Sequence, residues 1–162
     1  MRAATCVLVI FVIRLALALG SVPPWQNPDE PQHVMAVWFT GAHDTSPDAV
    51  ARMERAVIES MARHRWWELV GESTPSPLPA RFADDKALEE RWITMPRTGG
   101  LYYAVAAAVC ATPSPEHTLE AARRLSAAAG LGVVVLAIAI GRSLLASWTG
   151  VGVGAVLALH PQ

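Results

Sequence analysis

Charged residues are scarce in this chain of 162 residues. Asp, Glu, Lys and Arg make up only 17% of it, whereas hydrophobic residues make up 52%. That is little charge for the surface of an ordinary soluble domain. The basic residues form no stripe of the kind that binds nucleic acid, so we expect no nucleic-acid partner. Cysteine is nearly absent: Cys6 and Cys110 both lie in apolar runs, so we expect no disulfide.

The sequence also lacks the short motifs of common soluble enzymes. It contains no phosphate-binding loop, no dinucleotide-binding fingerprint and no Ser/His/Asp or Cys/His arrangement. The spacing Glu30-x-x-His33 occurs once, whereas helical di-metal sites use it in pairs. If the chain holds a divalent metal ion, we expect its ligands among Asp29, Glu30 and His33. One short motif does not define a coordination sphere, so the sequence leaves metal dependence open.

What the chain does have is a membrane pattern. Apolar residues concentrate in 3–20 and 101–160, and nearly all the acids lie between. The first run is long enough, at about 27 Å as a helix, to cross a hydrocarbon core. A cleaved signal peptide is the competing interpretation, but Arg14 interrupts the apolar core and the run is long for a signal peptide. We favour an uncleaved anchor, with Arg2 inside and residues 21–100 outside the cytoplasm.

We therefore predict an all-α polytopic membrane protein with about four spans. Residues 1–20 form the first transmembrane helix, 21–100 an extracytoplasmic loop with amphipathic helices, and 101–162 three further membrane helices. The first of these three is short, about 18 Å before Pro113. The other two are predicted at 125–141 and 144–160, with a tight turn at Arg142-Ser143. The chain stops directly after its last apolar run, so we expect it to be the N-terminal part of a longer protein.

The loop 21–100 is acidic and patterned. It holds 8 Lys and Arg against 12 Asp and Glu, a charge of −4. Asn27-Pro28 predicts the start of a helix ending near Gly41, with Glu30 in its first turn. Ser46-Pro47-Asp48 predicts a second helix, whose apolar stripe leads to Trp66-Trp67. That helix either lies flat in the headgroup region or packs on a core of the loop's own, and the sequence leaves both open. An extended segment over 71–82 and a short helix over 84–92 follow.

Asp29, His33 and Arg14 are the residues most able to carry chemistry. On a helix, Asp29 and His33 share a face, with Glu30 adjacent. Carboxylates at this place act as a general base, as metal ligands or as partners of a basic phosphate-binding group. The simpler alternative is that both acids only stabilise the start of a helix. Arg14 in mid-span indicates a buried partner or a water-filled cavity, unless it snorkels to the surface.

These features together resemble the GT-C superfamily of polytopic glycosyltransferases. The resemblance includes protein O-mannosyltransferases, aminoarabinose transferases and bacterial membrane families whose loop begins PPDEPxH. It is carried by Pro-Asp-Glu-Pro-x-His at 28–33, after a span that bears an arginine. Leu101-Tyr102-Tyr103 is similar to the LYY of the family's HPPLYY, 123–127 to its RLLSA pattern, and Gly141-Arg142 to the end of its third span. The HPP triplet is replaced around Met95-Pro96-Arg97.

The resemblance implies an inverting transfer of a sugar from a polyprenyl-phosphate donor to an extracytoplasmic acceptor at a bacterial inner membrane. Asp29 would act as general base and Glu30 as a supporting carboxylate, with a divalent metal ion nearby in some members. His33, Arg14, Tyr102 and Tyr103 would contact substrate. Two other hypotheses stay open. One is a non-catalytic membrane protein, or an inactive fragment, whose loop binds a partner. The other is a secreted protein with a cleaved leader.

Overall fold

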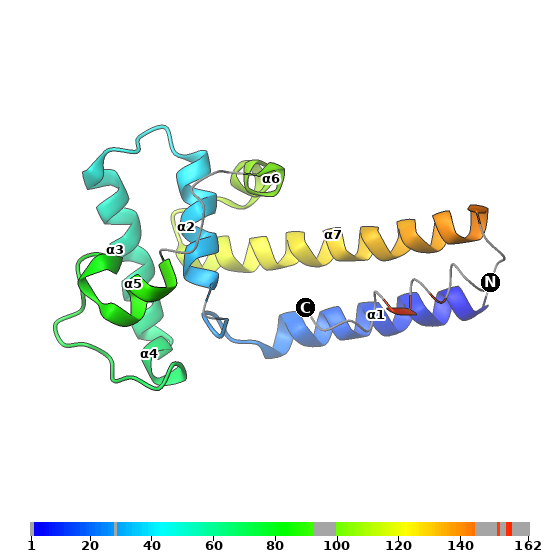
Figure 1. Ribbon diagram of the computed structural model, residues 1–162, viewed down its shortest axis with the longest axis horizontal. Coiled ribbons are helices and arrows are strands. Elements are labelled where there is room, and N and C mark those ends of the chain that lie inside the picture. Colours follow the sequence, from blue (N-terminus) through cyan, green and yellow to red (C-terminus); the bar gives the residue numbers. More distant parts are fainter. Residues whose placement is uncertain (1, 28, 93–99, 145–151, 153–154, 157–162) are drawn as a thin grey trace. The chain divides into compact units, whose positions relative to one another are not determined.

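The computed structural model describes residues 2–27, 29–92, 100–144, 152 and 155–156 (Figure 1). These residues form helices and connecting segments, with no strand among them, so the predicted all-α class is confirmed. The chain divides into two compact units. One is a helix pair built from residues 1–22 and 123–162. The other, residues 23–122, is called the loop unit below.

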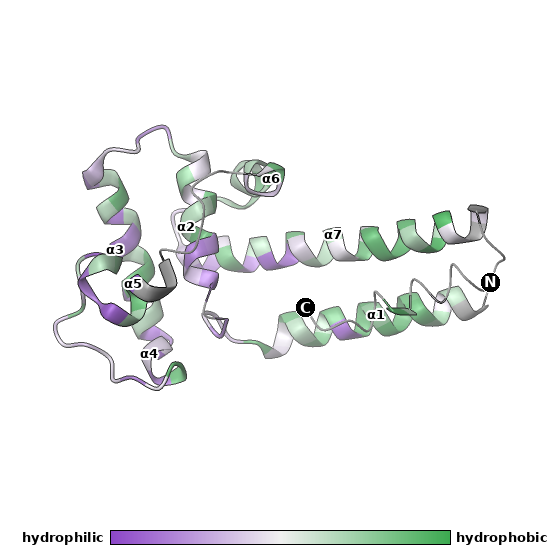
Figure 2. Cartoon of the chain, in the orientation of Figure 1, coloured by the Kyte–Doolittle hydropathy of each residue, from purple (hydrophilic) through white to green (hydrophobic). Residues whose placement is uncertain are grey.

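The helix pair consists of α1 (Arg2–Ser21) and the later turns of α7 (Pro115–Leu144). Phe11 packs with Val134 and Ile138 between the two helices, whose other faces remain apolar (Figure 2). The exposed large side chains of this unit include Val9, Ile10, Val12, Ile13, Leu17, Val133, Val135, Leu136 and Ile140. Such outward apolar faces are typical of helices that lie in lipid.

Two of the described helices are long and apolar enough to cross a membrane, at Ala4–Ser21 and Pro115–Gly141. This supports an integral membrane protein. The first ten residues of α7 carry all of its charges but that of Arg142, at Glu116, Glu120, Arg123 and Arg124. We therefore place the hydrocarbon-spanning part of α7 from Leu125 onward. The Arg123 side chain donates to the Val22 carbonyl at 2.6 Å, which links the end of α1 to this level of α7.

The structure differs from two details of the predicted span pattern. A third detail concerns residues that the structure does not describe. The predicted second span is only a ten-residue helix, α6 (Leu101–Cys110), about 15 Å long and too short to cross a bilayer. The predicted turn at Arg142-Ser143 is wrong, because α7 continues through both residues. Two polar residues without proline do not end a helix. The predicted span 144–160 lies almost entirely outside the described residues.

The loop unit contains the remaining helices, with the first turns of α7. They are α2 (Glu30–Gly41), α3 (Pro47–Arg63), α4 (Trp66–Leu69), the 3-10 helix η1 (Phe82–Asp84), α5 (Lys86–Trp92) and α6. α3 begins as its sequence predicts: Ser46 is the N-cap, and its hydroxyl accepts from the Ala49 N–H at 3.3 Å. The predicted helix over 84–92 is confirmed as α5, two residues shorter at its start.

The core of the loop unit shows what the apolar stripe of the amphipathic helix α3 contacts. Val57, Ile58 and Met61 are fully buried, and Trp66 and Trp67 are each only 1% exposed. These side chains form one cluster with Trp25, Val34, Met35, Phe82, Leu88 and Leu119. The apolar stripe of α3 therefore packs on the loop's own core. The alternative, with the two indoles at a lipid interface, is wrong.

An ion pair between a buried carboxylate and a partly exposed arginine joins the extended segment 71–81 to α3. Glu54 on α3 is 5% exposed and accepts from the Arg81 guanidinium. The same carboxylate accepts from the Phe82 N–H at 3.4 Å. Three donors thus compensate the desolvation of one buried carboxylate, which is what a buried charge requires.

Candidate functional site

The candidate site lies where the start of α2 meets the start of α6, within the loop unit. α6 packs along α2, and after Tyr103 its inward side chains are small. A Cβ added at Gly41 would lie 3.2 Å from the Cβ of Ala107, so the two helices approach closely. This contact brings Tyr103, near the start of α6, beside His33 in the first turn of α2.

Asp29 occupies the N-cap position of α2 but does not cap the helix. Its side chain accepts no hydrogen bond from the first backbone N–H groups of α2. Its backbone is already helical (φ −93°, ψ −8°), whereas a residue that caps through its side chain has extended backbone angles. The carboxylate instead contacts the His33 ring, with Oδ2 3.2 Å from Nε2. Asp29 therefore makes no capping hydrogen bond, while its charge at the start of α2 still interacts favourably with the helix dipole.

The observed start of α2 differs from the predicted one. Asn27 is expected as the N-cap, yet the helix begins at Glu30, and Pro28 lies outside the described residues. The Asn27 amide donates to the Glu30 carboxylate at 3.3 Å, while the Glu30 N–H donates to the Asn27 carbonyl at 3.1 Å. The two adjacent acids thus have separate surroundings: Glu30 is 5% exposed, and Asp29 faces solvent.

His33 is held through both ring nitrogens. Nδ1 lies 2.6 Å from the Tyr103 hydroxyl, and the two rings stack with centroids 5.9 Å apart. An ionised Asp29 only accepts hydrogen bonds, which places the imidazole proton on Nε2 and leaves Nδ1 to accept from the tyrosine. Partial burial raises the pKa of Tyr103, as do Tyr102 and the Asp29 charge, so the phenol keeps its proton and donates. The result is a hydrogen-bond chain Tyr103–His33–Asp29.

The hydrogen-bond chain Tyr103–His33–Asp29 leaves one oxygen of Asp29 without a partner among the described residues. Asp29 Oδ1 accepts no hydrogen bond from the part of the chain that the structure describes, and the Asp29 side chain is 61% exposed. His33 has no nitrogen left over, since each is already engaged. The available base in this arrangement is therefore Asp29, and His33 with Tyr103 fixes its orientation.

No family model, curated protein or solved structure matches the chain.

The other predicted substrate contacts are placed differently. The Tyr102 hydroxyl donates to the Ala122 carbonyl at 3.4 Å, and its ring meets Tyr103 edge to face. Tyr102 thus joins α6 to the first part of α7. Arg14 belongs to the helix pair, where it is half-buried on the side of α1 that carries Phe11 and Leu15. Its contact with substrate stays a prediction.

The predicted metal ligands do not converge. Asp29 and His33 meet, but Glu30 turns to Asn27 instead. Among the described residues, no three His, Cys, Asp or Glu side chains lie close enough to hold a metal ion together. The arrangement of Asp29 and His33 as seen here fits a proton-transfer pair better than a coordination sphere.

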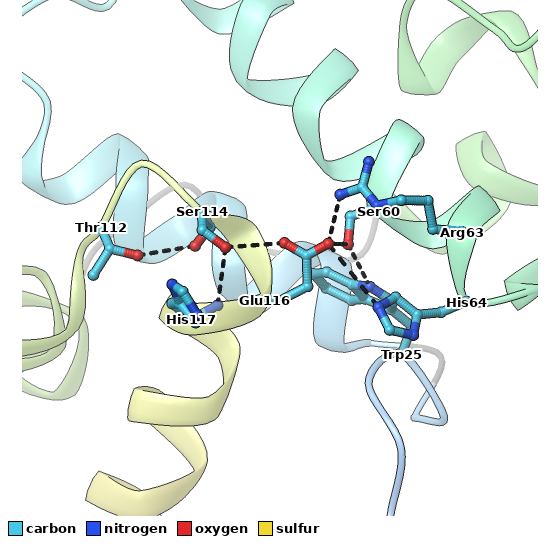
Figure 3. A network of polar contacts seen from close by, with 8 residues as sticks. All are labelled: Trp25, Ser60, Arg63, His64, Thr112, Ser114, Glu116 and His117. Atoms are coloured by element: carbon cyan, nitrogen blue, oxygen red, sulfur yellow. Dashed lines mark hydrogen bonds and ion pairs between the residues drawn. The ribbon is translucent and has the colours of Figure 1, made fainter.

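A second polar network, centred on Glu116, is one that sequence reasoning missed (Figure 3). Glu116 Oε1 accepts from the Ser60 hydroxyl at 2.6 Å and from the Arg63 guanidinium at 2.5 Å. Oε2 accepts from the Ser114 hydroxyl at 3.0 Å. Ser60 in turn accepts from the buried Trp25 indole at 2.8 Å. The available signal was Ser114-Pro115-Glu116, which is typical of a helix start.

The lowered pKa of Glu116 distinguishes this network from the candidate site. Partial burial acts to raise the pKa of Glu116, but hydrogen bonds from Ser60, Arg63, its own backbone and Ser114 outweigh burial and lower it to about 2. A carboxylate so stabilised is a weak base at neutral pH. We assign the Glu116 network to the architecture of the loop unit. Asp29, exposed and with one oxygen open, is the more accessible carboxylate.

Two described cavities of the loop unit lie elsewhere. One, of about 460 Å³, is bounded by residues at the end of α2, the start of α3 and 111–113. The other, of about 390 Å³, lies between Trp67, 70–73 and 85–87. Neither is lined by Asp29, His33 or Tyr103.

Proposed function

We propose that this chain forms the membrane-anchored N-terminal part of a GT-C-type glycosyltransferase. In this proposal it transfers a sugar from a polyprenyl-phosphate donor to an acceptor outside the cytoplasm of a bacterium. The observation that carries it is the hydrogen-bond chain Tyr103–His33–Asp29, which orients an exposed carboxylate at the start of α2. Further support comes from the span-length helix α1, which ends eight residues before Asp29.

The reaction assigned to Asp29 is base-assisted displacement. Its open oxygen, Oδ1, takes the proton of the acceptor hydroxyl as the acceptor oxygen bonds to the anomeric carbon. The bond from that carbon to the phosphate oxygen breaks, and the polyprenyl phosphate leaves with the electron pair. Because attack and departure occur on opposite faces, the anomeric configuration inverts. The His33 Nε2–H bond to Oδ2 holds the carboxylate in one orientation during the transfer.

The test of this proposal is an Asp29→Asn variant. The asparagine oxygen still accepts from His33 Nε2, so the local hydrogen bond is kept while the basic carboxylate is lost. The full-length protein to which this N-terminal part belongs is reconstituted in liposomes with polyprenyl-phosphate-linked sugars, and release of polyprenyl phosphate is measured. We expect a loss of transfer of at least about 100-fold, the usual contribution of a general base.

Asp48→Asn, which changes an exposed acid in the first turn of α3, is the matched control. Equal turnover of the Asp29 and Asp48 variants would refute the base assignment.

One observation favours a second candidate, a membrane-anchored binding module. The loop unit has a core of its own with three fully buried tryptophans, and the Glu54–Arg81 pair and the Glu116 network join its segments. A binding module would keep its function after Asp29→Asn. Partner capture that is unchanged in the variant, with no transfer by either protein, identifies this alternative.

A further inference from the structure

α6 is apolar on two opposite faces. Ala106 and Cys110 are buried against α2, with Ala107 half-buried beside them. The residues of the other face are exposed, and its largest members are Leu101 at 82%, Val105 at 43% and Val109 at 67%. They recur at intervals of four, together with the exposed Ala104 and Ala108, so they form one stripe along the helix. We call this stripe the outer face of α6.

This distribution is the reverse of that on an ordinary surface helix. Such a helix turns its large apolar residues to the core and its charges to water. In α6 the small residues Ala106, Ala107 and Cys110 face α2, together with Tyr103 at the start of the helix, whereas Leu101, Val105 and Val109 face outward. No charged residue occurs anywhere from position 98 to 115. A helix that is apolar all round belongs in a protein core or in lipid.

We infer that the outer face of α6 lies in the interfacial region of the same bilayer that α1 and α7 cross. Chain connectivity supports lipid as the occupant. Residues 111–114 join α6 to α7, and α7 runs as one helix from Pro115 to its apolar part at Leu125. Those ten residues rise about 15 Å, which is more than the thickness of the headgroup layer, about 5–8 Å on each side. Ala122, whose carbonyl accepts from the Tyr102 hydroxyl, lies only three residues before Leu125, or about 5 Å along α7. This bond therefore holds the first turn of α6 at the level of the headgroup layer.

Length and flanking residues agree with an interfacial position. At about 15 Å, α6 is too short to span the hydrocarbon core, yet it is long enough to lie along its surface. Tyr102 stands at its first turn with its hydroxyl bonded to the Ala122 carbonyl, and tyrosine is enriched at membrane interfaces. The inward side of the helix needs no water, because α2 covers it. The inference concerns this bilayer contact alone and does not depend on transferase activity.

The test uses the full chain in nanodiscs that hold one copy each. Cys6 and Cys110 are replaced by alanine, and single cysteines at Val105→Cys or Val109→Cys carry an NBD fluorophore. Glu59→Cys, on the exposed side of α3, is the matched control. Lipids with a nitroxide on the acyl chain quench only fluorophores that enter the membrane. Because an interfacial helix buries its apolar face at the acyl boundary, we expect emission to fall by about half at 105 and 109 and to stay unchanged at 59.

Two results would overturn the inference. Emission at 105 and 109 like that of NBD in water, with no quenching, would mean that the outer face stays in solvent. Blue-shifted emission without nitroxide quenching would mean that protein, not lipid, covers it. Tryptophan emission matching that of the parent chain ensures that each labelled variant is folded.

Discussion

At the residue scale, the orientation of His33 depends on two partners that are far apart in sequence. Asp29 is one helical turn before it, and Tyr103 is 70 residues after it. The neighbouring Tyr102 supports α6 through a different acceptor, the Ala122 carbonyl. The two adjacent tyrosines therefore offer a matched pair for separating the site from the fold.

We predict that Tyr103→Phe removes the hydrogen bond to His33 Nδ1 and leaves the proton on Nε2, because Asp29 still accepts from it. In the ¹⁵N spectrum of histidine-labelled protein in nanodiscs, the Nδ1 resonance of His33 should move toward that of an unbonded imidazole nitrogen. The expected loss of stability is about 1 kcal/mol, that of one net hydrogen bond. Tyr102→Phe should leave the His33 resonances in place. A Tyr103→Phe spectrum identical to that of the parent would contradict the hydrogen-bond chain.

At the element scale, sequence patterns located most of the helices but not the role of each. The caps at Ser46-Pro47 and the stripe through Val57 and Met61 predicted α3, because local rules set both. The apolar composition of α6 suggested a span, because hydropathy does not distinguish a helix that packs along a neighbour from one that crosses a membrane. The deciding contact, Gly41 against Ala107, joins residues 66 positions apart and has no signal in local spacing.

That contact gives a prediction for the α2–α6 packing. Gly41→Ala places a methyl group 3.2 Å from the Ala107 Cβ, so α6 must shift by a few tenths of an ångström. We expect a loss of about 1–2 kcal/mol in the free energy of unfolding, the usual cost of overpacking. It is measured by urea unfolding in mild detergent, followed by tryptophan emission.

Ala107→Gly supplies the control for this cycle. Alone it should cost about 1 kcal/mol through helix propensity. Together with Gly41→Ala it should cost less than the sum of the two, because the added methyl group then has room. Strict additivity of the two changes would show that the helices do not meet at this point.

At the scale of the whole molecule, the sequence distinguished a membrane part from an acidic loop. It did not predict which segments of the loop contact one another. The i, i+4 relation of Asp29 and His33 follows from helix geometry alone, and the sequence predicts it. Tyr103 entered only through a family resemblance. Glu116 was missed, because its partners come from α3 and from the turn before α7, and only folding brings these segments together.

The Glu116 network gives the loop unit a predictable response to acid. The folded-state pKa of Glu116 is about 2, against an ordinary value of 4.5. Because the folded value is the lower one, its stabilisation is complete above pH 4.5 and is lost as the pH falls toward 2. The shift corresponds to about 3 kcal/mol in the free energy of unfolding.

Glu116→Gln should therefore destabilise the full chain by about 2–3 kcal/mol at pH 7, where the parent carboxylate is charged, and by little at pH 2. Urea unfolding in detergent at a series of pH values measures this, and Trp25, whose indole donates to Ser60, reports on the network directly.

Glu59→Gln is the control. Glu59 pairs with Arg55 on the exposed side of α3, so this substitution should change the free energy of unfolding little at any pH. A Glu116→Gln penalty that is constant from pH 7 to pH 2 would mean that the carboxylate gains nothing from its charge, and that Glu116 acts through packing alone.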